Sequence, residues 1–355
     1  MSSQTDPHDS IGFGIVGCGM IANFHAKAIA DAKGCHLVGV TARRSDAAAE
    51  FAGKYECESF GTLESMLSDD RIGAVSICTP SGAHLDPAVE AAKAGRHVVV
   101  EKPLEITTER CDQIIRACDD AGVRLSVTFQ SRFHRSSQLM KRAVEEKRFG
   151  TVTLGDAYVK WYRSQEYYDS GAWRGTWSLD GGGALMNQAI HSVDLLLWLM
   201  GPVQEVSAMT STLTHERIEV EDVAIANVKF RSGALGVIEA TTTAYPGALK
   251  RIEISGDKGS AILEEEDIKA WDFKDEHSDD EEIRETMAGR TQTGGGAADP
   301  AAIGHHGHTA LFEEVAAAIH EDRPSSLDGH EGRRSVELIE AIYQSARTGM
   351  IVKLH

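Results

Sequence analysis

Lys102 is the first residue whose type and position indicate chemistry. It follows Glu101 and three consecutive valines at 98–100, and Pro103 comes next. Three β-branched residues in a row predict a strand buried on both faces, as in the interior of a parallel sheet. Because proline disfavours a helical backbone at the preceding residue, we expect Lys102 at the carboxyl end of this strand, where α/β sheets bind ligands. A partly dehydrated ammonium there is a candidate proton donor or acceptor; the alternative is a solvated Glu-Lys pair that closes the strand.

A second set of polar residues follows three glycines at 181–183. Asn187, His191 and Asp194 are spaced i, i+4 and i+7 in an otherwise apolar stretch. This spacing places them on one face of a helix predicted over 183–199. Polar side chains on a buried helix need partners, which a ligand pocket supplies. The alternative is a structural network in which Asp194 orients His191.

A G-x-G-x-x-A motif runs from Gly17 to Ala22, between a short apolar strand and a predicted helix, 21–32. Its first glycine allows a tight turn, its second lets a pyrophosphate approach the backbone, and the helix N-terminus faces the phosphates. The positions of this motif predicted to bind a dinucleotide are Gly17, Gly19, Met20 and Ile21.

The end of the second predicted strand, 36–41, bears on which dinucleotide is bound. NAD-specific folds usually have a carboxylate here for the ribose hydroxyls. This chain has Ala42, followed by Arg43 and Arg44. Guanidinium groups favour an additional 2′-phosphate, so NADP is predicted in preference to NAD. The alternative is that both arginines are surface charges and that other contacts bind NAD.

The elements that position these residues fall into two groups. Strands and helices alternate regularly in the first third of the chain, which predicts a doubly wound parallel sheet of the Rossmann type. Beyond residue 150, successive strands without intervening helices predict a large, mostly antiparallel open sheet. The runs predicted as strands are 152–162, 203–213, 222–231, 234–243, 249–255 and 260–264. The predicted fold is therefore α/β, with a dinucleotide-binding domain over 1–128 and an α+β substrate-binding and oligomerisation domain over 129–355.

Composition disfavours several classes of partner. The net charge of -18 argues against nucleic acid and against an anionic membrane. No apolar window approaches the length of a membrane span, and the N-terminal residues lack the features of a secretory signal. Six cysteines without C-x-x-C spacing fit free thiols in a reducing cytoplasm. We expect no metal site, because the histidines at 305, 306 and 308 have no carboxylate or cysteine at ligand spacing.

Taken together, the chain resembles the Gfo/Idh/MocA oxidoreductase family over nearly its full length. Besides the glycine motif, the matching features are Thr79-Pro80 with His84, Glu101-Lys102-Pro103, and the glycine triplet followed by His191 and Asp194. The resemblance implies hydride transfer between C4 of a nicotinamide and a carbon of a sugar, polyol or related compound. It also implies Lys102 and His191 as the proton-handling and substrate-orienting pair. Cofactor contacts are accordingly expected at Thr79, Pro80, His84, Glu101 and Lys102.

The chain departs from the family at one position. Many relatives carry aspartate where this chain has Asn187. Because an amide cannot take up a proton, we expect Asn187 to orient the substrate or Lys102, and Lys102 and His191 to do the acid–base work.

Aromatic residues are concentrated between 161 and 177. Aromatic faces beside arginine suit a sugar ring, and Trp173-Arg174 is similar to a family pair that lies near the nicotinamide. Core packing or a subunit contact is the alternative. The residues predicted to bind substrate are Asn187, Asp194, Gln130, Arg132, Tyr162, Trp173 and Arg174.

The leading interpretation is a cytoplasmic NADP- or NAD-dependent dehydrogenase or reductase acting on a CH–OH group of a carbohydrate-like compound. Two alternatives stay open: a redox-neutral NAD-dependent glycosidase of the same fold, and a non-catalytic nucleotide-sensing protein. An antiparallel sheet with one face free of helices usually buries that face. In the family it is often covered by another subunit, so we expect a homo-oligomer, either a dimer or a tetramer.

Overall fold

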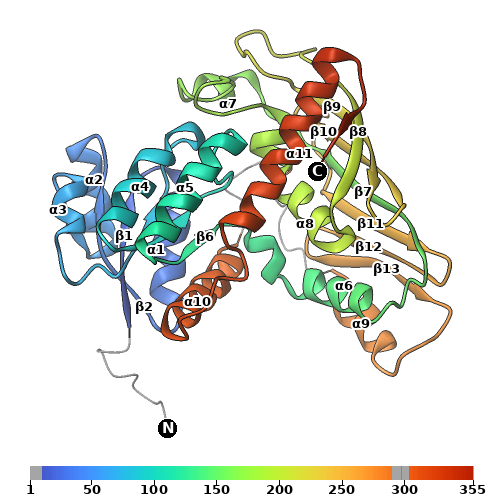
Figure 1. Cartoon of the computed structure of the whole chain (residues 1–355), viewed down its shortest axis with the longest axis horizontal. Coiled ribbons are helices and arrows are strands. Elements are labelled where there is room, and N and C mark those ends of the chain that lie inside the picture. Colours follow the sequence, from blue (N-terminus) through green and yellow to red (C-terminus); the bar gives the residue numbers. More distant parts are fainter. Residues whose placement is uncertain (1–9, 290–296, 298–303, 355) are drawn as a thin grey trace. The chain divides into compact units, whose positions relative to one another are not determined.

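The computed structural model describes residues 10–289, 297 and 304–354 (Figure 1), and they divide into two units. The first unit contains residues 10–130 and 304–333, and the second contains the other described residues. The returning segment 304–333 lies beyond the boundary expected at residue 128, yet it packs with the first unit. Among the described residues, no helix is long and apolar enough to cross a bilayer.

A six-stranded parallel sheet forms the centre of the first unit, with strand order β3-β2-β1-β4-β5-β6. In chain order its strands are β1 Ile11–Val16, β2 Cys35–Thr41, β3 Glu58–Ser59, β4 Ala74–Ile77, β5 His97–Val100 and β6 Leu125–Val127. The order reverses direction between β1 and β4, which is where ligands bind in this kind of sheet. The predicted doubly wound Rossmann arrangement is confirmed.

Helices connect these strands. They are α1 Met20–Asp31, α2 Ser45–Tyr55, α3 Leu63–Leu67, the short 3-10 turn η2 Ser81–Ala83, α4 Leu85–Lys93 and α5 Thr108–Ala121. From the returning segment, α10 (His306–His320) packs against α1, and the rings of Phe13 and Phe312 meet edge to face at 5.2 Å. The N–H of Val127 donates to the carbonyl of Leu327, which ties the segment to β6. These contacts explain why the segment belongs to the first unit.

An eight-stranded sheet forms the second unit, with order β13-β12-β11-β7-β10-β9-β8-β14. Its strands are β7 Val152–Lys160, β8 Val203–Ser211, β9 Val223–Phe230, β10 Leu235–Thr241, β11 Arg251–Gly256, β12 Gly259–Glu264, β13 Asp267–Phe273 and β14 Val352–Lys353. All neighbours pair antiparallel except β7 and β10, which run parallel. The predicted mostly antiparallel sheet is confirmed, with β13 and β14 as strands that the sequence did not predict.

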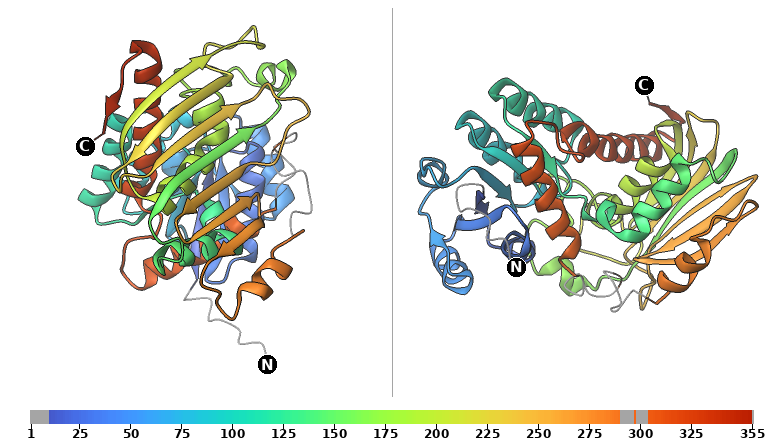
Figure 2. Two further views of the ribbon diagram at one scale, coloured as in Figure 1. Left: turned by 90° about the vertical axis from the view of Figure 1, so that its right-hand side faces the viewer. Right: turned by 90° about the horizontal axis from the view of Figure 1, so that it is seen from below.

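One face of this sheet is covered and the other is not. The helices and turns of the unit are η3 Gln130–Phe133, α6 Arg135–Glu145, α7 Gln165–Asp169, the π-helix η4 Ala184–Ala189, α8 Ile190–Met200, α9 Asp280–Thr286 and α11 Gly329–Thr348. The boundary between the units falls inside two of these elements. Gln130 of η3, and the residues of α11 up to Arg333, belong to the first unit. Helix α8 packs on β7 and β11, and α6 packs on α8 and β12. The opposite face carries no helix among the described residues (Figure 2).

The helix predicted over 183–199 consists of two segments in the structure. The first, η4, is a π-helix, and α8 continues from Ile190. A π-helix closes its hydrogen bonds from residue i to i+5, so Asn187 and residues on α8 do not keep one α-helical register. The consequence is that Asn187 and Asp194 have different neighbours.

Candidate active site

The residues predicted to form the site divide between the two units. In the first unit, the residues predicted to bind the dinucleotide include those at the N-terminus of α1. Gly17 has φ 103°, and a Cβ there would lie 2.7 Å from the carbonyl oxygen of Cys78. At Gly19, by contrast, no heavy atom lies within 4 Å of a Cβ position. No side chain caps α1, and its first turn, which begins with Met20 and Ile21, has no acidic residue. Open space beside unsatisfied helix N–H groups fits a dinucleotide pyrophosphate.

Two loops flank this turn at the same edge of the sheet. Thr79 and Pro80 follow β4, and Glu101 and Lys102 follow β5, which is hydrogen-bonded to β4. Gly17 follows β1, the other neighbour of β4. Because the strands are parallel, their carboxyl ends meet at one edge. The structure therefore brings these five predicted cofactor residues to one side of the first unit.

His84 links the two loops. Its ring is buried, with Nδ1 at 2.9 Å from the carbonyl oxygen of Pro103 and Nε2 at 3.0 Å from that of Thr79. Burial lowers the pKa of His84, and the nearby carboxylate of Glu105 opposes that effect. In this structure His84 acts as a bridge that fixes the loops following β4 and β5.

Glu101 contacts a buried histidine, His25, that the sequence analysis did not identify. Its Oε1 lies 2.7 Å from Nε2 of His25, and its Oε2 accepts the backbone N–H of Lys102 at 3.0 Å. Nδ1 of His25 lies 2.6 Å from the hydroxyl of Ser76. Burial lowers the pKa of His25, but Cys78 and Glu101 outweigh it and raise that pKa to about 10. Burial opposes ionisation of Glu101, yet the bond from His25 prevails and lowers its pKa.

Glu101 links His25 to the backbone of Lys102. Both carboxylate oxygens are engaged, one by an imidazole and the other by the peptide N–H of Lys102. The backbone at Lys102 is thereby fixed, while its side chain remains half-buried. A fixed backbone beneath a partly accessible ammonium suits a proton-transfer group.

Arg43 and Arg44 lie exposed just past β2. Arg44 immediately precedes α2, and its guanidinium is 3.9 Å from the carboxylate of the exposed Asp46. In this fold the adenosine ribose lies near the end of the second strand. Both guanidinium groups are thus exposed in the region where the adenosine ribose is expected.

In the second unit, Asn187 contacts an acidic residue, Asp180. Nδ2 of Asn187 donates to Oδ1 of Asp180, and Oδ2 of Asp180 accepts the backbone N–H of Gly175 at 2.8 Å. Oδ1 of Asn187 accepts a bond from Nε2 of Gln188 at 3.1 Å. Asn187 is half-buried, whereas Asp180 is only 1% exposed.

A network of aromatic and guanidinium groups adjoins this pair. Arg174 donates to the hydroxyl of Tyr167, and its guanidinium lies 4.1 Å from the Tyr167 ring and 4.7 Å from the Trp173 ring. Gln188 donates to the same hydroxyl at 2.9 Å and accepts a bond from Arg163 at 3.0 Å. Side-chain contacts through Tyr167 and Gln188 therefore connect Trp173 and Arg174 to Asn187.

Arg132 and Asp194, both predicted to bind substrate, bind each other. Nε and Nη2 of Arg132 lie 2.8 and 2.6 Å from the two carboxylate oxygens of Asp194. Both side chains are buried, and the guanidinium also lies 5.5 Å from the ring of Trp198. A bidentate buried pair of this kind fixes α8 to η3, since each charge satisfies the other.

The remaining predicted residues are more accessible. His191 is half-buried in the first turn of α8, and Gln130 is half-buried at the start of η3. Tyr162 forms a β-bridge with Thr243, and its ring meets that of the exposed Tyr245 edge to face at 5.2 Å.

Glu221 is another functional candidate that sequence reasoning missed. It lies in the turn between β8 and β9, is 3% exposed, and accepts the backbone N–H groups of Gly183 and Leu185 at 3.0 and 2.8 Å. The hydroxyl of Tyr343 donates to it at 2.9 Å. Glu221 therefore holds the first residues of η4, the segment that carries Asn187. No spacing marks it in the sequence, where it is one of four acidic residues between β8 and β9.

One group in the first unit has ligand atoms close enough to hold a metal ion. Atoms of His25, Glu101 and His308 all lie within 4.8 Å of one another, and the three side chains are buried. Both ring nitrogens of His25 already face partners, Ser76 and Glu101. A metal ion would have to replace the bond between His25 and Glu101, so these residues are better described as an ion-pair network.

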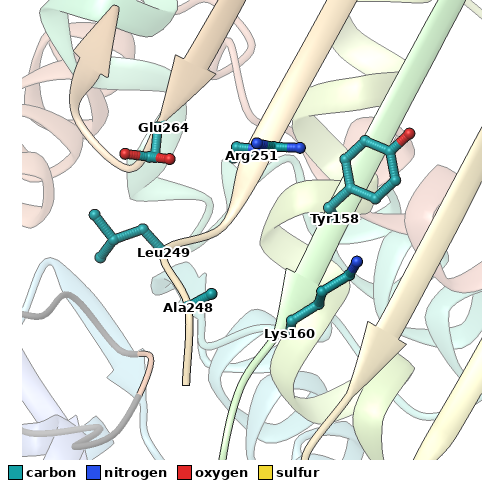
Figure 3. Close-up of a pocket in the computed structure, with 6 residues that line it drawn as sticks. All are labelled: Tyr158, Lys160, Ala248, Leu249, Arg251 and Glu264. Carbon is teal, nitrogen blue, oxygen red and sulfur yellow. The ribbon is translucent and has the colours of Figure 1, made fainter. Parts of the chain in front are cut away.

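A shallow hollow of about 230 Å³ lies on the uncovered face of the second sheet (Figure 3). It is lined by Tyr158, Lys160, Ala248, Leu249, Arg251 and Glu264. The charged groups of Lys160 and Arg251 lie near the Tyr158 ring. Each is paired with a carboxylate: Lys160 with Glu239 at 3.3 Å and Arg251 with Glu253 at 2.7 Å. The hollow includes none of the residues predicted to bind cofactor or substrate.

Comparison with known proteins gives matches over both units. Residues 11–129 match a family model described as an oxidoreductase family with an NAD-binding Rossmann fold, and residues 137–262 match the GFO/IDH/MocA C-terminal domain. The myo-inositol 2-dehydrogenase of Thermotoga maritima is 31% identical over 255 residues, which cover 69% of this chain and 73% of that protein.

Solved structures extend the match to the whole chain. The WlbA dehydrogenase of Bordetella pertussis, in complex with NADH and UDP-GlcNAcA, is 39% identical with a TM-score of 0.86, covering 98% of this chain and 99% of that one. Levoglucosan dehydrogenase in complex with NADH and L-sorbose is 25% identical with a TM-score of 0.84, over 98% and 99% of the two chains.

Proposed function

The chain belongs to the Gfo/Idh/MocA family of oxidoreductases with an NAD-binding Rossmann fold, and from this premise we propose that it acts on a nucleotide-linked sugar of the UDP-GlcNAcA class. It is a nicotinamide-dependent dehydrogenase or reductase that transfers hydride at a CH–OH or C=O carbon of a sugar, polyol or derivative. The observation that supports the finer proposal is the 39% identity to WlbA dehydrogenase over nearly all of both chains, against 25% to levoglucosan dehydrogenase.

In the proposed mechanism, Lys102 acts as the acid–base group. The turn around Gly17 and Gly19 would hold the dinucleotide, whose nicotinamide supplies the hydride acceptor when bound. The neutral amine of Lys102 accepts the proton of the substrate hydroxyl as the carbinol becomes a carbonyl. In the reverse direction Lys102 returns that proton. The bond from Glu101 to the backbone of Lys102 supports this role, because it fixes the position from which the ammonium extends.

Among the arginines of the second unit, Arg174 is the one we propose for an acidic group on the sugar. Arg132 is neutralised by Asp194, and Arg163 is buried and bonded to Gln188 and to backbone carbonyls. Arg174 is half-buried between Tyr167 and Trp173, whose rings suit the face of a sugar. A planar guanidinium matches a carboxylate with two parallel bonds.

Nicotinamide absorbance tests this function directly. UDP-GlcNAcA, UDP-GlcNAc, levoglucosan and myo-inositol would be offered with NAD and NADP in turn, with Lys102→Ala as the inactive control. Highest turnover with UDP-GlcNAcA, abolished in the variant, is the expected result. Turnover only with inositol or levoglucosan would retain the dehydrogenase and remove the nucleotide-sugar proposal. Cofactor binding without any turnover would favour the redox-neutral glycosidase or the nucleotide sensor.

For the cofactor, we propose that NADP is preferred over NAD. Arg43 and Arg44 support this because both are exposed beyond β2 and no carboxylate occupies position 42. The relatives solved with NADH, WlbA and levoglucosan dehydrogenases, support NAD instead. A comparison of kcat/KM for the two cofactors decides between them.

We also propose that the uncovered sheet face pairs with a second copy of the chain. Four adjacent strands present exposed apolar side chains there: Leu154, Leu235, Ile225 and Met209. Exposed apolar side chains on a sheet face that no described helix covers favour an interface. Light scattering of the purified protein should give a dimer or tetramer, and a monomer would contradict the proposal. The six free cysteines support our further proposal of a cytoplasmic location.

A further inference from the structure

We propose that Asp180 is a positioning residue of the reaction, which fixes the amide of Asn187 in the one orientation that the site uses. The inference rests on the proposed contact between Asn187 and substrate. It adds a carboxylate that neither the glycine motif nor the helix pattern identifies.

The carboxylate of Asp180 is itself rigidly held. It is 1% exposed, and its Oδ2 accepts the backbone N–H of Gly175 at 2.8 Å. The backbone N–H groups of Asp180 and Gly181 both donate to the carbonyl of Thr176, at 3.1 and 3.2 Å. A tight turn therefore presents Oδ1 toward the π-helix with little freedom to move.

This placement determines how Asn187 is oriented. An ionised carboxylate only accepts hydrogen bonds, so the NH₂ group of the amide must face Asp180. On its other side, Oδ1 of Asn187 accepts from Gln188, whose own carbonyl accepts from Arg163. The chain of bonds has one direction from Arg163 to Asp180. These two contacts fix which side of the Asn187 amide carries the NH₂ group and which carries the oxygen.

The pair also explains why an amide suits position 187 in this chain. An aspartate there would place a second carboxylate in contact with the buried carboxylate of Asp180, and one of the two would have to bind a proton. With asparagine, the pair carries a single negative charge, located on Asp180. Exchanging the two residues should therefore preserve both the charge and the hydrogen bond.

Four variants test the inference: Asp180→Asn, Asn187→Asp, the exchange that combines both, and Asn187→Ala. The assay would use UDP-GlcNAcA, or the panel compound with the highest turnover, and would record kcat, KM and the pH dependence of kcat/KM. Asp180→Asn allows either amide orientation, so kcat should fall about tenfold or more. Asn187→Asp should add an ionisation to the pH profile. The exchange should remove that ionisation, but kcat should stay low, because position 187 then carries a carboxylate and no amide.

Controls separate positioning from structure. Asp169→Asn makes the same chemical change at an exposed residue that pairs with Arg217, and it should leave kcat unchanged. Cofactor binding and the melting temperature would be measured for every variant. A D180N protein that loses thermal stability but keeps kcat and KM would overturn the inference. The inference would also be overturned if N187A were slow while D180N kept the wild-type kcat. If N187A itself kept the wild-type rate, the proposed contact between Asn187 and substrate would be overturned together with the inference.

Discussion

The hydroxyl of Tyr343 donates a hydrogen bond of 2.9 Å to the same oxygen of Glu221 that accepts the backbone N–H of Leu185 at 2.8 Å. One buried carboxylate therefore joins α11 to the first turn of the π-helix. Glycines allow this approach: a Cβ at Gly182 would overlap the Tyr343 hydroxyl, and one at Gly183 would overlap the carbonyl oxygen of Glu221. This packing explains why positions 182 and 183 are glycines.

We expect Glu221 to make stability depend on pH. Burial raises the pKa of Glu221 to about 7, although bonds from backbone N–H groups oppose it. A carboxyl whose folded pKa is raised stabilises the fold fully below its unfolded pKa, and this contribution is lost as pH rises through the folded pKa. The free energy of unfolding should fall by about 3 kcal/mol between roughly pH 4.5 and 8 through this group. Glu221→Gln should remove most of that dependence.

Urea unfolding at several pH values measures the effect. Glu216→Gln changes an exposed carboxylate in the same connection between β8 and β9, so it should retain the wild-type dependence. Identical pH profiles for wild type and E221Q would mean that the three hydrogen-bond donors keep Glu221 ionised throughout.

Gly183→Ala should destabilise the second unit. The added methyl group would overlap the Glu221 carbonyl oxygen, a backbone atom that cannot move aside cheaply. We expect a loss of about 2 kcal/mol or more in the free energy of unfolding. Gly53→Ala is the matched control, because Gly53 lies exposed in α2 with no atom near its Cβ position. It should stabilise by about 0.5–1 kcal/mol, since alanine is the better helix former. Equal effects of the two changes in denaturant unfolding would contradict this account.

The fold was predictable wherever a local pattern determines it. Buried parallel strands such as β5 are short apolar runs, and alternating burial marks strands such as β9. Strand β13 was missed because a bulge in its pairing with β12 interrupts the alternation of its buried residues. The π-helix was missed because its sequence, 184–189, has nothing that distinguishes it from an α-helix.

The site was predictable only in part, for a related reason. Lys102 and Gly17 are marked by their immediate neighbours in the sequence. The partners that hold the site are distant: His25 and Glu101 are 76 residues apart, and Leu185 and Glu221 are 36 apart. Arg132 and Asp194, 62 residues apart, each had the features of a ligand-binding residue, and only the fold shows that they pair. Such pairs depend on tertiary contacts that one sequence does not reveal.

The ion pair between His25 and Glu101 should have its own pH window. The pKa of His25 is raised to about 10, so its contribution to stability is full below its unfolded pKa of 6.5 and is lost as pH rises toward 10. The pKa of Glu101 is lowered, so its contribution is present above 4.5 and lost as pH falls. Both contributions are complete between about pH 4.5 and 6.5.

His25→Ala tests this window. The change leaves Glu101 buried without its counter-ion, which should cost about 3–5 kcal/mol near pH 6. The cost should shrink toward pH 10, where the wild type loses the pair as well. His36→Ala, at a more accessible histidine of the same unit, should show no such change with pH. A cost for H25A that stays constant from pH 6 to 10 would indicate packing rather than charge.

Replacing Arg43 and Arg44 together by alanine should change cofactor preference without changing the chemistry. Removing guanidinium groups from the end of β2 removes the proposed partners of a 2′-phosphate, and KM for NADP should rise about tenfold or more. KM for NAD and the limiting kcat should stay near wild type, because neither the ribose hydroxyls nor Lys102 depends on these arginines. Initial rates with both cofactors measure the effect, and Arg116→Ala, an exposed arginine on α5, is the control for net charge. An unchanged KM for NADP in the double variant would identify Arg43 and Arg44 as surface charges and leave NAD as the natural cofactor.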